Sequence, residues 1–312
     1  MTSCDSKEDD EPENKPDGIA LNQRFKDNRN DAVQTFTINA STGGIVTGSQ
    51  GTKVIIPANA IGQNGTAVTG NIDVELVEIY NKAAMVLQDM STKGKKQNND
   101  EEALKSAGEF FVNAKQNGTQ LEVLLPITIE SKELDPTDWE PMQVFRAGDN
   151  LEDNDLWQEA DEDNDGINDE AKGREGEGGQ EGNYVMYSAF DMSEFGWTNL
   201  DIWYNFTGQL TDLFVDVPDG YDNDNAAVYL SYDGENGLAK MDIYDTTLEQ
   251  FTEHFGRIPV GKEVHFIMIT EIDGQINYAI QPATIVDDHV EIINSLQPIS
   301  QTDLTTLINA LP

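Results

Sequence analysis

The residues with the clearest chemical pattern form an acidic stretch that begins at Asp161 and reads DEDNDGINDE. Carboxylate oxygens occupy alternate positions in it, and Gly166 then permits a sharp turn. A hard cation such as Ca²⁺ takes about six to eight oxygen ligands, and this pattern supplies several of them. The candidate metal ligands are Asp161, Asp163, Asp165 and Asp169. The alternative is a solvated acidic loop, because residues 160–182 are rich in Gly, Asp and Glu.

This stretch resembles the calcium loops of thrombospondin type 3 repeats and of EF-hands. It departs from the EF-hand at its twelfth position, where Lys172 replaces the expected bidentate Glu. Asp169 fits the thrombospondin spacing better. The resemblance implies Ca²⁺ as the cofactor. A second acidic cluster, residues 219–225, fits an Asx-rich turn between two strands better than a cation site.

A second candidate site is an aromatic segment, residues 195–204, whose sequence is FGWTNLDIWY. Alternation with period two places one set of side chains on a common face: Trp197, Asn199, Asp201 and Trp203. Exposed tryptophans beside Asn and Asp would suit binding of a sugar or a peptide. A strand buried on at least one side is the favoured interpretation. In that case the two polar residues need hydrogen-bond partners or an exposed groove.

Motifs for covalent or metal-dependent catalysis are missing from the sequence. It contains no Gly-x-Ser-x-Gly, no His-Glu-x-x-His and no phosphate-binding glycine loop, and its one cysteine is not accompanied by a catalytic pattern. We therefore expect no catalytic residues and no enzyme activity. A pair of carboxylates for glycoside hydrolysis could still be hidden among the 58 acidic residues.

The charge balance limits the partners. There are 58 acidic and 19 basic residues, which gives a formal net charge of −39. Phosphate backbones and anionic lipid surfaces are repelled by such a chain, so nucleic acid is excluded as a partner. A single cysteine also excludes an internal disulfide.

That cysteine, Cys4, lies in a sequence that resembles the end of a bacterial lipoprotein signal, where one large apolar and two small residues precede the lipid-bearing cysteine. The charged and apolar segments of such a signal do not precede it here, so the resemblance implies a trimmed or mis-started precursor. A polar, Pro-containing stretch follows and is expected to be a disordered tether up to residue 33. The resemblance implies membrane attachment through a lipid on Cys4. The alternative is a free cysteine in a disordered tail.

The residues after the cysteine bear on the destination of the protein. Lys7 and the four acidic residues after it resemble the signal that sends Bacteroidota lipoproteins to the outer face of the outer membrane. Asp5 would instead mean retention at the inner membrane under the enterobacterial rule. We expect a lipid-anchored protein of the cell envelope, located at the outer membrane and exposed at the surface, with the leaflet left open.

From Gln34 onwards, short apolar runs of period two separated by Gly, Asn and Asp predict antiparallel strands. The sequence therefore predicts an all-β fold of two antiparallel β-sandwich domains with a short C-terminal helix. The expected parts are the tether at 1–33, a first sandwich at 34–131, and a second at 132–312 with an acidic insertion at 160–182 and a helix at 302–311. A further helix is expected at 247–255, and one strand at 119–130.

One part of the first sandwich has a recognisable pattern: Gly43-Gly44 followed by residues 51–61, GTKVIIPANAI. This resembles the β-sandwich domain shared by ankyrins, netrin receptors and tight-junction scaffolds. Residues 65–77, Thr92, residues 106–111 and residues 195–201 are similar to uncharacterised Bacteroidota surface lipoproteins that carry this sandwich. The resemblance extends over residues 34–300. It implies the fold and transfers no catalytic residue.

Together these patterns predict a non-enzymatic, envelope-anchored lipoprotein that acts as a binding or scaffold module, stabilised by Ca²⁺ if the acidic stretch is a metal site. Two alternatives stay open. One is a glycan-binding or glycan-active surface protein that uses the aromatic segment. The other is a structural component of an envelope assembly. The sequence names neither a protein partner nor a glycan.

Overall fold

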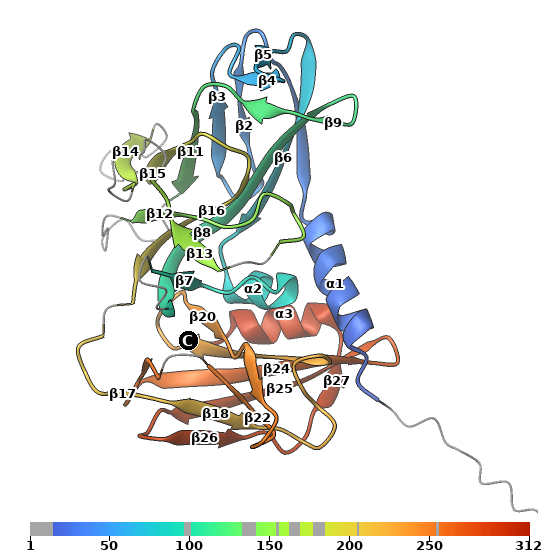
Figure 1. The fold of residues 1–312 in the computed structure, drawn as a ribbon, viewed down its shortest axis with the longest axis vertical. Coiled ribbons are helices and arrows are strands. Elements are labelled where there is room, and N and C mark those ends of the chain that lie inside the picture. The colour runs from blue at the N-terminus through green and yellow to red at the C-terminus, as the bar shows by residue number, and fades with distance from the viewer. Residues whose placement is uncertain are drawn as a thin grey trace, which may run out of the picture.

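The structure is a computed structural model. It describes residues 15–96, 101–132, 142–153, 156–161, 169–176, 185–204, 206–253 and 256–312. The fold is all-β, as the sequence predicts, with two sandwiches of sheets and a short C-terminal helix. Figure 1 shows one sandwich above the other, with helices between them.

The upper sandwich contains three sheets. Sheet A has the strand order β1 (Gln34–Asn39), β6 (Asn71–Ile79), β8 (Glu101–Gln116), β16 (Gly196–Trp203), β12 (Gln143–Arg146), β13 (Trp157–Glu159), β7 (Lys93–Lys95), and β9 (Thr119–Gln120) pairs with β8. Sheet B has the order β14 (Lys172–Gly176), β15 (Val185–Met192), β11 (Ile127–Lys132), β3 (Lys53–Ile56), β2 (Gly44–Thr47). A small sheet contains β10 (Glu122–Val123), β4 (Ile61–Gln63) and β5 (Thr66–Ala67).

The lower sandwich is built in the same way. Sheet F has the order β20 (Leu238–Lys240), β19 (Ala226–Tyr232), β24 (Glu263–Ile272), β25 (Gln275–Thr284), β27 (Gln297–Ile299). Sheet E has the order β21 (Ile243–Asp245), β22 (Gln250–Thr252), β18 (Leu213–Asp216), β26 (His289–Ile292). A short pair joins β17 (Leu210–Thr211) to β23 (Ile258–Pro259). Among the described strands, the pairs β13–β7 and β18–β26 are parallel and the others are antiparallel.

Helices fill the layer between the two sandwiches. They are α1 (Gly18–Asp31), α2 (Lys82–Gln88) and α3 (Gln301–Asn309). Apolar residues of these helices join one core cluster with the inward face of sheet A and with sheet F, while two further clusters fill the sandwiches themselves. The layers are therefore B, A, helices, F and E (Figure 1). No helix of the described residues is long and apolar enough to cross a membrane.

Helix α1 corrects the expectation that the chain is a disordered tether up to residue 33. The Asp17 carboxylate accepts a hydrogen bond from the backbone N–H of Ala20 at 2.9 Å and so caps the helix. Leu21, Phe25 and Arg29 recur every four residues and are buried. The helix is stable because this face packs against the layer between the sandwiches, which composition alone could not reveal.

The sheets also divide the chain at a different place from the expected boundary near residue 131. Strands β12 and β16 pair with each other, and β16 pairs along β8, so residues well beyond 131 complete sheet A. Strand β15 likewise pairs with β11 in sheet B. The upper sandwich thus extends to β16, and the lower one begins at β17.

Two local expectations were wrong and one was confirmed. Where a helix was expected at 247–255, the described residues 247–253 form a turn and then strand β22, because β22 pairs on both sides, with β18 and with β21. The strand expected at 119–130 is divided among β9, β10 and β11, which belong to three sheets. The C-terminal helix is confirmed as α3, and Ser300 caps it by accepting from the N–H of Asp303.

Candidate functional site

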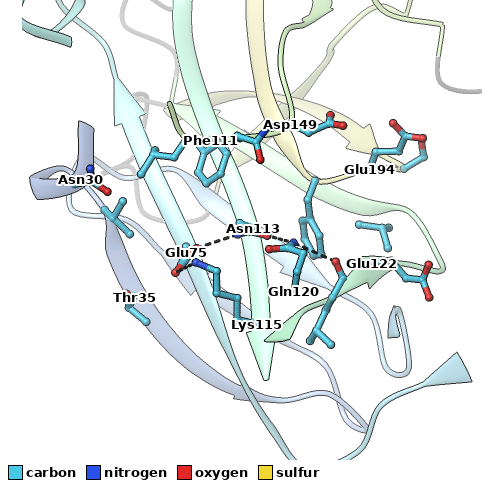
Figure 2. Close-up of a pocket in the computed structure, with 17 residues that line it drawn as sticks. Asn30, Thr35, Glu75, Phe111, Asn113, Lys115, Gln120, Glu122, Asp149 and Glu194 are labelled. Carbon is cyan, nitrogen blue, oxygen red and sulfur yellow. Dashed lines mark hydrogen bonds and ion pairs between the residues drawn. The ribbon is translucent and has the colours of Figure 1, made fainter. Parts of the chain in front are cut away.

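A groove opens on the helix-facing side of sheet A. Its volume is about 1030 Å³. Figure 2 shows its floor and rim. The floor of the groove includes Glu75, Phe111, Asn113, Lys115 and Gln120. Its rim includes Asn30, Glu122, Asp149 and Glu194. We call this feature the sheet A groove.

The groove exists because the covering helix is shorter than the strands. On β8, Phe111, Asn113 and Lys115 alternate onto one face of the sheet. Phe111 lies under the helical layer and is 2% exposed. The centroid of its ring is 5.4 Å from that of Trp197. Helix α1 ends at Asp31, so the same face of the strand continues into solvent. The side chains there are polar, and their exposure rises along the strand from Asn113, which is buried, to the Lys115 side chain, which is 39% exposed.

A hydrogen-bond network holds the floor of the sheet A groove in place (Figure 2). The Glu75 carboxylate accepts from Asn113 Nδ2 at 3.0 Å and from Lys115 Nζ at 2.8 Å. Gln120 Nε2 donates to Asn113 Oδ1 and to the carbonyl of Leu121. Each side chain is therefore fixed before any ligand arrives, which lowers the entropic cost of binding.

The rim adds negative charge. Together the groove-lining residues carry the carboxylates of Glu75, Glu122, Asp149 and Glu194 and the single ammonium of Lys115. A smaller hollow of about 390 Å³ adjoins the rim and shares Asp149 and Glu194 with it. Neutral or cationic ligands are favoured in such a field, and anionic ones are repelled.

A second group of polar residues lies deeper on the same face of sheet A. Glu109 on β8 is directly opposite Asn199 on β16, and Ser106 is opposite Asp201. Asn199 Nδ2 donates to Asp201 Oδ2 at 2.7 Å. Glu109, Asn199 and Asp201 are 0% exposed, and Ser106 is buried. We call these four residues the buried oxygen cluster.

Burial dominates the electrostatics of the buried oxygen cluster. Desolvation raises the pKa of Glu109 well above its ordinary value, and the nearby Asp201 raises it further. Desolvation also raises the pKa of Asp201 well above its ordinary value, although hydrogen bonds from Ser106 and Asn199 oppose the change. Among the described residues, no cationic side chain contributes to the pKa shift of either carboxyl.

A β-bulge builds this cluster. The pairing of β16 with β8 shifts between Leu200 and Asp201, opposite Gly108. Gly108 has φ +141°, and a Cβ there would lie 2.7 Å from ring atoms of Phe110 and Tyr80. The extra residue reverses the alternation of β8, so Ser106 and Glu109 reach the same face although they are three positions apart.

Glu109 and Asp201 are neighbouring carboxyls, the kind of pair that the sequence left open for glycoside hydrolysis. Both are 0% exposed beneath the helical layer. In this structure the pair is covered by protein and does not lie on a solvent-facing surface.

The structure separates the residues of the aromatic segment. Trp197, Asn199 and Asp201 are 0% exposed, which confirms the buried-strand interpretation and removes them from a solvent-facing ligand surface. Trp203 is half-buried; its indole N–H donates to Glu159 Oε1 at 2.7 Å, and Lys96 Nζ lies 4.7 Å from its ring centroid. The expected need of Asn199 and Asp201 for partners is met in part, by each other.

The other predicted site residues are placed less completely. Cys4, Asp163 and Asp165 lie outside the described residues. Asp161 lines the smaller hollow, and the N–H of Asp169 donates to the carbonyl of Ala160 at 2.9 Å. Within the described ranges, no group of three or more His, Cys, Asp or Glu side chains converges in a geometry for a metal. The calcium loop thus stays a prediction.

The second acidic cluster is a turn, as expected. Between β18 and β19, the Asp222 carboxylate accepts from the N–H of Asp224 at 2.9 Å, and the Asn225 side chain accepts from the N–H of Asp222 at 3.2 Å. These bonds are the Asx turns that such sequences form.

Sequence reasoning missed the sheet A groove and Glu109. The alternation of Phe111, Asn113 and Lys115, apolar and then polar at the end of a strand, is the signal that a covered face becomes exposed. Glu109 stands alone in an apolar run, which is the signal for a buried charge. Its partners could not be named without the register of β16.

Comparison with known proteins adds no family. No family model matches the chain, and no curated protein does. Among solved structures, a γ-CGTase from alkalophilic Bacillus clarkii is similar over 83% of this chain and 40% of that one, at 10% identity with a TM-score of 0.19. The chain spans about two fifths of that structure, and a likeness at this level carries no argument about fold or function.

Proposed function

We propose that this chain is the non-catalytic binding module of a lipid-anchored envelope protein, and that the sheet A groove binds a neutral carbohydrate chain. The observation that carries the proposal is the pre-ordered polar floor formed by Glu75, Asn113, Lys115 and Gln120. The envelope location and the anchor at Cys4 rest on the sequence pattern.

The chemistry of the floor favours hydroxyl groups. Amide and carboxylate side chains side by side can donate to and accept from neighbouring hydroxyls of a sugar ring, as polar groups do in small-molecule sites. An apolar ligand would displace the water that hydrates these groups without replacing its hydrogen bonds, which costs about 1–3 kcal/mol for each group that loses a partner. A sugar chain avoids that cost.

The negative charge of the groove further narrows the class of ligand. Four carboxylates and one ammonium line it. The whole chain carries a formal net charge of −39. Sulfated, phosphorylated or uronate-rich polysaccharides would be repelled, whereas a neutral glycan is not.

The groove is tested with an array of neutral and anionic polysaccharides, followed by titration calorimetry on the strongest neutral hit. We expect binding to a neutral glycan and at least a tenfold weaker affinity in the double variant Asn113→Ala with Gln120→Ala. Gln116→Ala is the matched control, since its amide bonds to the carbonyls of Thr69 and Asn71 and does not line the groove. Absence of neutral-glycan binding, or equal binding by the double variant, would refute the proposal.

The anchor is tested separately, in the cell that makes the protein. Labelled palmitate should be incorporated into the full-length protein, and Cys4→Ala should abolish both the label and the recovery in the membrane fraction. Unchanged fractionation of Cys4→Ala would show that attachment does not depend on this residue.

A further inference from the structure

We propose that the buried oxygen cluster of Ser106, Glu109, Asn199 and Asp201 binds one Ca²⁺ ion. This site is separate from the acidic stretch that begins at Asp161 and from the sheet A groove. It would hold sheet A together beneath the helical layer, as a structural ion.

The buried oxygen cluster contains acceptor oxygens that the described donors do not satisfy. Four oxygens of the cluster have no hydrogen-bond partner among the described residues: Glu109 Oε1, Glu109 Oε2, Asn199 Oδ1 and Asp201 Oδ1. All four are acceptors when the carboxyls are ionised. Asn199 is 0% exposed, and its amide oxygen has no donor although its Nδ2 is bonded to Asp201. Since the residue opposite Asn199 is Glu109, acceptors face acceptors. A positive species between them removes this conflict.

The negative charge of the cluster also favours a bound cation. An isolated buried carboxylate is costly, and two without a cationic partner are costlier. Two other buried charges of this protein are paired with an opposite charge: Glu271 with Arg24 at 2.6 Å, and Lys93 with Asp242 at 2.9 Å. Among the described residues, no basic side chain contributes to the electrostatics of Glu109 or Asp201. One divalent cation would neutralise both at once.

The candidate ligand atoms of the cluster favour a hard cation. Every candidate ligand is an oxygen, from two carboxylates, an amide and a hydroxyl, which is the donor set of a hard cation. Ca²⁺ takes about six to eight oxygens at roughly 2.3–2.6 Å and tolerates irregular geometry. The four oxygens without partners, with Asp201 Oδ2 and Ser106 Oγ, reach the lower end of that number. Mg²⁺ keeps several waters and fits a dry, enclosed site less well.

The bulge at Gly108 supports a built site. A regular β8 would place Ser106 and Glu109 on opposite faces, and the cluster would not form. The bulge needs the positive φ of Gly108 and close packing against Phe110 and Tyr80. Bulges of this kind commonly re-aim side chains at functional positions.

The experiment compares chelator-treated full-length protein with and without added Ca²⁺, by thermal melting and by calorimetry. We expect a rise in melting temperature and saturable binding of Ca²⁺. The double variant Glu109→Gln with Asp201→Asn keeps the shape of both side chains and should lose this rise. The variant Asp163→Ala with Asp165→Ala disables the acidic stretch and should keep it. Glu109→Gln alone is the second variant if the double one does not fold, and it should weaken Ca²⁺ binding at least tenfold.

Three outcomes would overturn the proposal. The first is that Ca²⁺ shifts neither the melting temperature nor the heat signal, which would mean that the carboxyls hold protons. The second is an equal shift in wild type and in Glu109→Gln. The third is a shift lost only in Asp163→Ala with Asp165→Ala, which would assign the ion to the acidic stretch.

Discussion

The sheet A groove and the buried oxygen cluster occupy the same face of the same strand, only a few residues apart on β8. In the groove, Glu75 has both carboxylate oxygens bonded, to Asn113 and Lys115. In the cluster, neither oxygen of Glu109 has a hydrogen-bond partner in the part of the chain that the structure describes. Phe111 lies between the two, and the next residue on this face, Asn113, is still buried although it lines the groove.

The groove and the cluster differ in what stabilises their polar groups. In the groove, water stabilises whatever the protein does not pair, so a change of one side chain costs little. In the cluster, water is excluded, and any carboxylate charge must be neutralised by a proton or a cation. The two proposed sites therefore differ in kind. The groove suits a polar ligand that exchanges with solvent, and the cluster suits a cation that is part of the folded structure.

The largest effect is expected from Gly108→Ala, which disrupts the bulge that builds the buried oxygen cluster. The added Cβ would lie 2.7 Å from rings of Phe110 and Tyr80, at φ +141°. We expect a loss of about 2–4 kcal/mol in the free energy of unfolding, from strain and overpacking together. Urea denaturation measures it. Gly118→Ala is the control for positive φ without a steric clash; equal losses in both variants would show that the cluster packing is irrelevant.

The next effect compares paired and unpaired buried carboxylates. Glu271 is 3% exposed and forms two bonds of 2.6 Å with Arg24, which links α1 to β24. Glu271→Gln should destabilise the protein by about 1–3 kcal/mol, at the lower end because the Arg24 side chain is 28% exposed. In chelator at pH 8, Glu109→Gln should instead stabilise it. Urea denaturation of the two variants measures both changes in the free energy of unfolding. Changes of the same sign would contradict the distinction between paired and unpaired buried carboxylates.

A third prediction concerns pH in the metal-free protein. Burial raises the pKa of Glu109 and Asp201, so the folded state binds more protons than the unfolded state above pH about 4. Their contribution to stability is complete below that pH and is lost as the pH rises towards the raised values. The difference in unfolding free energy between Glu109→Gln and wild type should therefore grow from pH 5 to pH 8, by about 1–3 kcal/mol. A difference that does not change with pH would contradict the assigned pKa direction.

The smallest effect on stability is expected in the groove. Lys115→Met removes an ion pair whose ammonium side chain is 39% exposed, so the loss should be below about 1 kcal/mol. Glycan affinity should fall more than stability does, because Glu75 and Asn113 lose a fixed neighbour. Melting temperature and calorimetry are compared on the same sample. A large loss of stability would show that the groove network is structural.

The sequence predicted much of the fold and little of the sites. Alternation from Gln34 onwards predicted antiparallel strands, and β1 and β6 are among those that the structure has; the helix predicted at 302–311 is α3. Helix α1 was missed because only tertiary packing of Leu21 and Phe25 stabilises it. Strand β22 was expected as helix because its three residues depend on pairing with two distant strands.

The sequence by itself determined an all-β chain, a strong negative charge, turn positions and the aromatic strand, since each depends on local composition or alternation. The tertiary structure alone decided that β16 lies against β8. That pairing takes Trp197, Asn199 and Asp201 out of solvent, places Glu109 beside them, and leaves Asn113 and Lys115 beyond the end of α1. The register between strands about 90 positions apart follows from packing, and no local pattern encodes it.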